Sequence, residues 1–254
     1  MEVDNETQSV VDYAIADQEF AAIIPAVYQS LLVTKGTGAQ TGFPLLSCDT
    51  LTYLSGDTTD FDPNPVYSLN VSNTSCSLII PDGKVRAGKI TIRLTGKIRM
   101  PGSQMVLKLY DYGASGISYS CDSLVLSTRE SVASYASFGV KLVNGLCKTG
   151  PYSIKYKFDR IFTVYPAGDA AGSDAVVYMY GDGSGTNRQG KNFSTNTVQG
   201  TSLVKHKTCK YIDKGIMELT PEGFKTRMIN FGDGNCDDEA TFTVNENTVA
   251  FKLK

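Results

Sequence analysis

The chain has 254 residues and a mass of 27.4 kDa, with 41% hydrophobic and 20% charged residues. This composition excludes an intrinsically disordered chain, a collagen-like repeat and a small scaffold held together by disulfides alone. The sequence contains no run of about 18 apolar residues, the length that a membrane-spanning helix needs. The net charge of −2 lacks the basic excess of a nucleic-acid-binding surface, so we expect no nucleic-acid partner.

An acidic segment opens the chain. Residues 1–62 contain ten acidic residues and one basic residue, Lys35, whereas residues 63–254 contain 16 acidic and 23 basic residues. We interpret residues 1–9 as a solvated acidic tether in front of a mildly basic body.

Residues 10–32 carry a strong helical pattern, because apolar residues recur there with a spacing near 3.6. We expect a helix over about residues 8–32 that Pro25 kinks or splits. Since an isolated helix of this length is marginal in water, it must pack on the rest of the chain. The packing face is expected to consist of Ile23, Ile24, Val27 and Leu31. Residues 10–65 thus form a helix and loop region, with one short strand near Leu51–Leu54.

Residues 66–254 are expected to form a β domain. Apolar and polar residues alternate in stretches such as Ile90, Ile92 and Leu94, which places one face on a core. Turn signals such as Asn144-Gly145 separate about ten strands without intervening helices. The predicted fold is therefore mainly β. It is an antiparallel β-sandwich or a strongly curved meander or half-barrel of about ten strands, and the N-terminal α-helix packs on it to make a single globular unit.

Six cysteines are spread along the chain without a Cys-x-x-Cys pair: Cys48, Cys76, Cys121, Cys147, Cys209 and Cys236. Zinc sites usually use closely spaced ligand pairs and histidines, and this chain has one histidine. An even number of widely spaced cysteines is typical of disulfides in an oxidising compartment, although a cytosolic protein with free thiols is the alternative. The cysteines fall into neighbouring couples 28, 26 and 27 positions apart, which predicts the pairs 48–76, 121–147 and 209–236.

The pair Cys209–Cys236 has a further argument from hairpin geometry. If the strands on either side of Pro221-Glu222-Gly223 form a hairpin, the two cysteines lie nearly opposite each other at its open end. That separation suits a disulfide.

The start of the chain has no leader pattern. Met1 is followed at once by acidic residues, without the basic and apolar regions of a signal peptide. If the disulfides form, we expect that an export signal has been removed and that Met1 is not the natural start.

Two motifs invite a catalytic interpretation that the residues around them disfavour. Gly185–Asn192 is close to the phosphate-binding pattern G-x-x-x-x-G-K-[ST], but Asn192 replaces the hydroxyl and a strand-like stretch replaces the helix. We interpret this segment as a hairpin turn. His206 lies between two lysines in an alternating stretch, which favours an exposed strand histidine over a general base. With all cysteines in disulfides, no catalytic residue is assigned.

Asp233, Asn235 and Asp237 are weak candidates for a calcium site, because they place oxygen ligands at alternate positions. The EF-hand spacing fails, since Asp238 takes the glycine position and Val244 the position of the bidentate glutamate. A tight turn is the favoured interpretation, and we expect no cofactor. Several tyrosines are candidates either for stacking on a ligand or for packing on a sheet face with a wet hydroxyl: Tyr110, Tyr112, Tyr119, Tyr178 and Tyr180.

Four segments resemble a group of uncharacterised exported proteins of Bacteroidetes, many of them predicted lipoproteins. They are residues 4–20 (DNETQSVVDYAIADQEF), Asp82–Ile90, Cys209–Gly215 and Phe231–Val244, whose Gly-Asp-Gly-x-Cys-Asp pattern is the most specific part. The resemblance implies a lipid-bearing cysteine in front of the acidic tether, and it supports the pairing of Cys48 with Cys76. Cys121 and Cys147 depart from the pattern of the group. The resemblance implies a location and no activity.

We therefore expect an exported protein of the lipoprotein type, located in the periplasm or at the outer membrane and cell surface. We expect its only contact with the membrane to be an N-terminal lipid anchor that has been removed from this sequence. Its β domain is expected to bind an unknown ligand or protein partner without catalysis. The alternatives are a carboxylate-based hydrolase and a purely structural surface protein, and the sequence leans away from an enzyme. A dry, aromatic-lined concavity favours binding, whereas two carboxylates within about 10 Å in a cleft favour hydrolysis.

Overall fold

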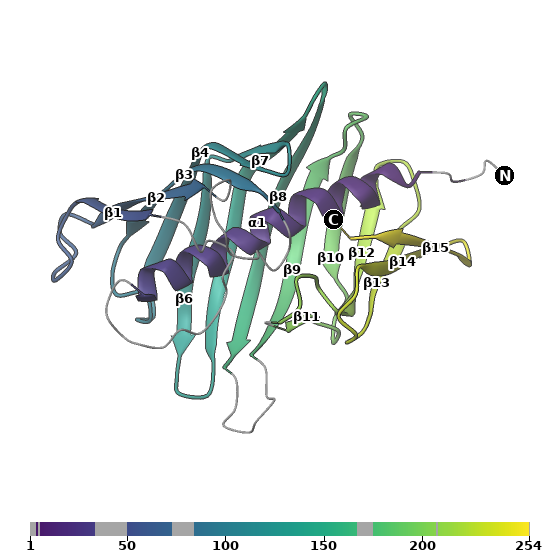
Figure 1. Ribbon diagram of the computed structural model, residues 1–254. Helices are drawn as coiled ribbons and strands as arrows, with labels where there is room; N and C mark the ends of the chain where they lie inside the picture. The colour runs from purple at the N-terminus through teal and green to yellow at the C-terminus, as the bar shows by residue number, and fades with distance from the viewer. Residues whose placement is uncertain are drawn as a thin grey trace.

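The alternating stretches form one large antiparallel sheet, and the helical stretch crosses its inner face (Figure 1). The computed structural model describes residues 4, 6–33, 50–72, 84–166, 175–206 and 208–253. These residues contain one helix, α1 (Gln8–Val33), and 15 strands. The strands are β1 (Thr50–Ser55), β2 (Val66–Ser72), β3 (Arg86–Leu94), β4 (Gln104–Ala114), β5 (Ile117–Ser120), β6 (Ser123–Ser131), β7 (Ala136–Thr149), β8 (Tyr152–Tyr165), β9 (Val176–Thr186), β10 (Asn192–Thr197), β11 (Leu203–His206), β12 (Lys214–Pro221), β13 (Arg227–Asp233), β14 (Glu239–Val244) and β15 (Asn247–Lys252).

The sheet is a meander, in which most strands pair with their neighbours in the sequence. Two strands depart from this order: β6 pairs with β4 and β7, and the short β11 pairs with β9 and β12. Of the two predicted architectures, the single curved sheet is correct and the two-sheet sandwich is not, and the strands outnumber the ten expected. Several of the additional strands are only four to six residues long, too short for a clear period-two pattern.

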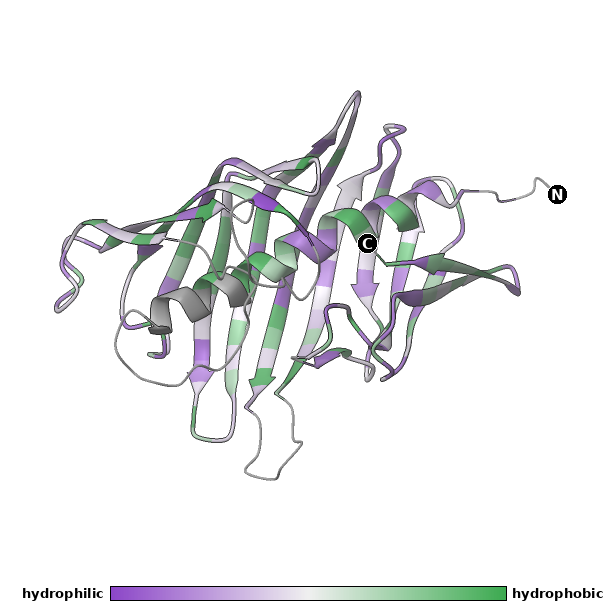
Figure 2. Ribbon diagram, viewed as in Figure 1, coloured by the Kyte–Doolittle hydropathy of each residue, from purple (hydrophilic) through white to green (hydrophobic). Residues whose placement is uncertain are grey.

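The predicted helix is confirmed, with its expected face buried against the sheet. Ile23, Ile24 and Val27 are buried, while the side chain of Leu31 lies outside the described residues. The helix continues through Pro25 to Val33, so the predicted split is wrong. Figure 2 shows hydrophilic and hydrophobic residues mixed along α1, and both kinds are buried. Among the described residues, no helix is long and apolar enough to cross a membrane.

The first residues of the chain differ from the expected tether. Glu6 and Ser9 are buried and α1 begins at Gln8, so this part of the predicted tether belongs to the folded domain. The Glu6 carboxylate accepts hydrogen bonds from the backbone N–H and the hydroxyl of Ser9, at 2.9 and 3.0 Å, and so caps the helix. The acidic pattern that suggested a solvated tether is explained by ionic contacts with the sheet.

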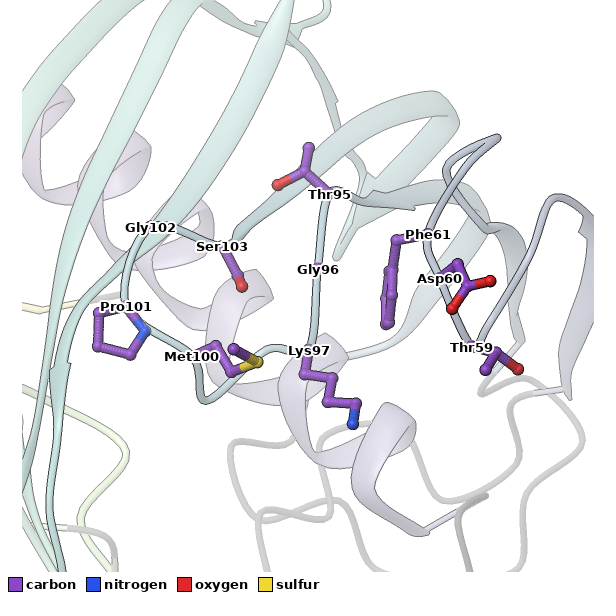
Figure 3. A pocket seen from close by; sticks show the side chains of 10 residues that line it. All are labelled: Thr59, Asp60, Phe61, Thr95, Gly96, Lys97, Met100, Pro101, Gly102 and Ser103. Atoms are coloured by element: carbon purple, nitrogen blue, oxygen red, sulfur yellow. The ribbon is translucent and has the colours of Figure 1, made fainter.

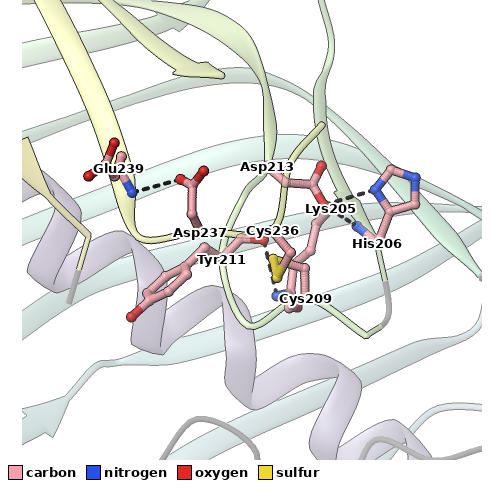
Figure 4. Close-up of a disulfide and its surroundings, with 8 residues drawn as sticks. All are labelled: Lys205, His206, Cys209, Tyr211, Asp213, Cys236, Asp237 and Glu239. Carbon is pink, nitrogen blue, oxygen red and sulfur yellow. Dashed lines mark hydrogen bonds and ion pairs between the residues drawn. A yellow bond between two sulfur atoms is a disulfide. The ribbon is translucent and has the colours of Figure 1, made fainter. Parts of the chain in front are cut away.

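The three predicted disulfides differ in how they compare with the structure. Cys209 and Cys236 form the predicted disulfide, with their Cα atoms 5.4 Å apart beside the β12–β13 hairpin (Figure 4). The predicted Cys121–Cys147 bond is wrong, because both are free thiols. The register of β5 and β7 places Tyr119 opposite Cys147 and leaves Cys121 two residues further along, out of reach. Cys48 and Cys76 lie outside the described residues.

Candidate functional site

Four buried acidic residues of the chain start are paired with arginines of the sheet on its inner face. The pairs are Glu6–Arg227, Asp12–Arg188, Asp17–Arg160 and Glu19–Arg86, and we call them the acid–arginine ladder. Each arginine comes from a different part of the sheet: β13, the β9–β10 turn, β8 and β3. The ladder therefore connects one helix to strands that are far apart in the sheet.

The pairs at the start of the helix tie it to the later strands. Arg227 donates through Nε and Nη2 to the backbone carbonyl of Glu6, at 3.1 and 2.7 Å, and its guanidinium also bonds Asp4. Asp12 accepts from the backbone N–H and from Nε of Arg188, both at 2.7 Å. Charge-assisted hydrogen bonds therefore hold the start of the helix to the sheet, although one oxygen of Glu6, Oε2, has no hydrogen-bond partner.

Asp17 is held at the centre of the sheet. Its carboxylate accepts hydrogen bonds from the hydroxyls of Tyr13, at 3.2 Å, and Tyr156, at 3.0 Å. Nη1 of Arg160 lies 2.7 Å from Asp17 as an ion pair without hydrogen-bond geometry, and its Nη2 donates to the Tyr156 hydroxyl. Burial first, and then the charge of Asp17, raise the pKa of Tyr13, so this phenol remains a donor.

Glu19 completes the ladder at the early strands. Arg86 donates to it through Nε at 2.8 Å and Nη2 at 3.0 Å, and the Tyr112 hydroxyl donates at 2.7 Å. Lys84 lies 3.3 Å away. Burial opposes ionisation of Glu19, but the hydrogen bonds and charge of Arg86 outweigh it and hold the pKa below its ordinary value.

The acid–arginine ladder has a structural role. Every carboxylate in it is paired with an arginine, so none is placed as a free acid or base, and a buried pair is by itself weak evidence of added stability. The sequence analysis missed it, although a signal was present in β8. Arg160 has the same parity as the buried Phe158 and Phe162, so the alternation itself places this arginine inside.

The motifs examined in the sequence have structural roles. The Gly185–Asn192 segment is the predicted hairpin turn between β9 and β10, where Asn187 Oδ1 accepts the backbone N–H groups of Gln189 and Lys191. His206 is a partly exposed histidine of β11, as predicted, but its Nδ1 lies 2.8 Å from the buried Asp213 (Figure 4).

The three residues considered as weak calcium ligands, Asp233, Asn235 and Asp237, form hydrogen bonds within a turn. Asn235 donates to Asp233 at 2.9 Å, and Asp237 accepts the backbone N–H of Glu239 at the same distance. Within the described residues, no group of three or more His, Cys, Asp or Glu side chains is placed to hold a metal ion.

The five candidate tyrosines divide between the two faces of the sheet. Tyr112 and Tyr119 are buried on the inner face, where Tyr112 bonds Glu19. Tyr110, Tyr178 and Tyr180 are exposed. The structure therefore separates two tyrosines that pack on the helix from three that face solvent.

Exposed aromatic rings gather on the outer face where β8 ends and β9 begins. Tyr165 lies 5.8 Å from Tyr135 and 5.6 Å from Tyr178, measured between ring centroids. Tyr180 follows Tyr178 on the same face of β9. Tyr165, Tyr178 and Tyr180 are each 40–48% exposed although they sit on well-paired strands. We call Tyr135, Tyr165, Tyr178 and Tyr180 the tyrosine patch.

The strands and a side-chain contact hold the patch in place. Tyr178 pairs with Thr163 of β8 on one side and with Val204 of β11 on the other. Glu130 forms a hydrogen bond with the hydroxyl of Tyr135, and this bond is the main cause of the raised pKa of Tyr135. A rigid backbone beneath exposed rings lowers the entropy cost of binding on this surface.

No protein-family model matches this chain, and no curated protein or solved structure is significantly similar to it.

Proposed function

We propose that this protein is an exported, non-catalytic binding domain that holds a partner protein on its tyrosine patch. The observation that carries this proposal is a contact among rings at the surface: Tyr165 and Tyr178 are both exposed and in edge contact, and the partly buried Tyr135 packs on Tyr165. Clustered exposed apolar groups are typical of interaction sites. Tyrosine is also enriched at protein interfaces, because it offers an apolar ring and a polar tip.

Ring orientation favours a protein over a polysaccharide as the partner. The planes of Tyr165 and Tyr178 are 82° apart, and those of Tyr135 and Tyr165 are 37° apart. Successive sugar rings of a chain stack best on rings that share a plane, whereas side chains of a protein fill the pockets between tilted rings. The patch therefore suits an uneven surface.

Two observations support the remaining parts of the proposal. The Cys209–Cys236 disulfide is compatible with an oxidising compartment and so with export. The buried carboxylates of Asp17 and Glu19 are engaged by arginines, an arrangement that lends no support to the hydrolase alternative. Because α1 packs across the inner face (Figure 1), we place the partner on the outer face, where the exposed tyrosines lie.

Site-specific photocrosslinking in the cells that produce the protein tests the proposal. Benzoylphenylalanine replaces Tyr178 in one variant and Tyr110 in a matched control, since Tyr110 is similarly exposed at 45% but lies on β4. We expect a discrete adduct with one protein at position 178 and none at position 110. The adduct should disappear when Tyr165→Ser is added to the first variant. Equal adducts at both positions, or none at 178, would contradict the proposal.

A further inference from the structure

A hollow of about 640 Å³ lies between two loops, residues 56–65 after β1 and residues 95–103 after β3. Its volume is within the ordinary range for small-molecule sites, about 300–1,000 Å³. Figure 3 shows the ring of Phe61 projecting into the space between the loops, with Asp60 on one side and Lys97, Met100 and Ser103 on the other. The hollow is made by loops other than those that carry the tyrosine patch.

The first loop is held in one conformation by its own hydrogen bonds. Asp57 accepts the backbone N–H groups of Thr59 and Asp60, at 2.5 and 3.0 Å, and donates its own N–H to the carbonyl of Pro63 at 2.7 Å. Phe61 has a φ of 62°, a left-handed conformation that is unusual for a bulky residue. Unfavourable backbone conformations are often kept at ligand sites, and here the residue with that conformation lines the hollow while its ring packs partly against the hydrophobic core.

The second loop is also held in place by hydrogen bonds. Gly102 donates to Thr128 at 2.8 Å, and Thr128 donates its backbone N–H to Ser103 at 2.9 Å. Gly96 forms part of the wall, where a Cβ atom would lie 2.6 Å from the Ser103 hydroxyl oxygen. The absence of a side chain at position 96 therefore gives the Ser103 hydroxyl the space that it occupies in this wall. Both walls are preformed, which reduces the ordering cost of binding.

We propose that the hollow binds one neutral sugar residue. A pyranose has an apolar C–H face, which suits the flat face of Phe61, and a rim of hydroxyls that both donate and accept hydrogen bonds. Asp60 supplies an acceptor, Lys97 a donor, and Ser103 a group that does both. The opposite charges of Asp60 and Lys97 cancel across the hollow, which favours a neutral polyol over an anion or a cation.

An NMR titration of the 15N-labelled full chain tests this inference. Glucose, galactose, mannose, fucose and N-acetylglucosamine are each added to millimolar concentrations, where weak single-sugar binding is visible. We expect at least one of them to produce saturable shifts of the amides of Gly96, Lys97 and Gly102. Phe61→Asn should abolish these shifts, because asparagine tolerates the left-handed conformation but has no ring. Asp60→Ala should weaken binding about tenfold or more.

The controls separate binding from folding. Tyr110→Ser removes an exposed ring elsewhere on the sheet and should leave the titration unchanged. If Phe61→Asn unfolds the chain, the exposed Asp60→Ala variant carries the test alone. The inference is overturned if none of the five sugars shifts these amides, or if the shifts survive in a folded Phe61→Asn variant. It is also overturned if a charged dipeptide shifts the same amides and the sugars do not.

Discussion

Removing the charge of Glu19 is the sharpest test of the acid–arginine ladder. Glu19→Gln keeps the size of the side chain but removes the carboxylate charge that pairs with the guanidinium of Arg86, itself 1% exposed. Breaking a buried pair by removal of one partner costs about 3–5 kcal/mol, because the remaining charge is desolvated and uncompensated. For a chain of this size, that loss corresponds to a fall of roughly 6–20 °C in Tm.

Urea unfolding at pH 7 under non-reducing conditions measures this cost. The double variant Glu19→Leu with Arg86→Met replaces the pair by apolar groups and should recover most of the lost stability, since such replacements are often neutral or stabilising. The coupling between the two sites comes from the cycle of single and double variants. The reasoning fails if Glu19→Gln loses less than about 1 kcal/mol, or if the double variant is less stable than both single variants.

The pH dependence gives an independent check on the same residue. The pKa of Glu19 in the folded chain lies below the ordinary value of 4.5. A lowered folded-state pKa means that the ionised pair stabilises the fold fully above about pH 4.5 and that this stabilisation is lost as the pH falls through the folded-state pKa. The stability difference between the wild type and Glu19→Gln should therefore shrink below pH 4.5. A difference that stays constant down to pH 2.5 would refute the assignment.

The remaining predictions concern the other buried and bonded groups. Asp17→Asn should destabilise the chain by about 3–5 kcal/mol in urea unfolding, whereas Lys141→Met, which breaks an exposed pair, should cost less than about 1 kcal/mol. Cys236→Ser should cost about 3–4 kcal/mol, from opening a loop with a sequence separation of 27, while circular dichroism keeps its β signature; an unchanged stability would argue against the bond. Iodoacetamide at pH 8 should leave Cys121 and Cys147 unmodified until urea is added, because burial raises the pKa of the Cys121 thiol to about 12 and that of Cys147 further; rapid labelling of the native chain would contradict this.

Local patterns in the sequence determined the fold class and the main elements. Alternation of apolar and polar residues depends on the period of a strand alone, so the antiparallel sheet was predictable without knowledge of its curvature. The helix over α1 followed from a spacing near 3.6 in the same way. Cys209 and Cys236 were predictable as a pair because a hairpin fixes distances over short stretches of chain.

Features that depend on several distant segments were decided by the tertiary structure. Tyr110 and Tyr112 have the same parity in the sequence, yet one faces solvent and the other bonds Glu19. The cause is an irregularity in β4, where Asp111 has a φ of 47° and the register with β3 shifts beside Gly88. Such a bulge re-aims every side chain that follows it.

The burial of the acidic residues at the start of the chain is a second feature that the tertiary structure decided. In one dimension, Glu6, Asp12, Asp17 and Glu19 are a charge pattern that suits solvent as well as a helix N-terminus. Their burial is possible only because arginines from four separate parts of the sheet meet them on its inner face. The sequence alone determined that these charges are close together on one segment. Only the folded sheet decided that they are buried, since a buried carboxylate needs a partner that lies far away in the chain.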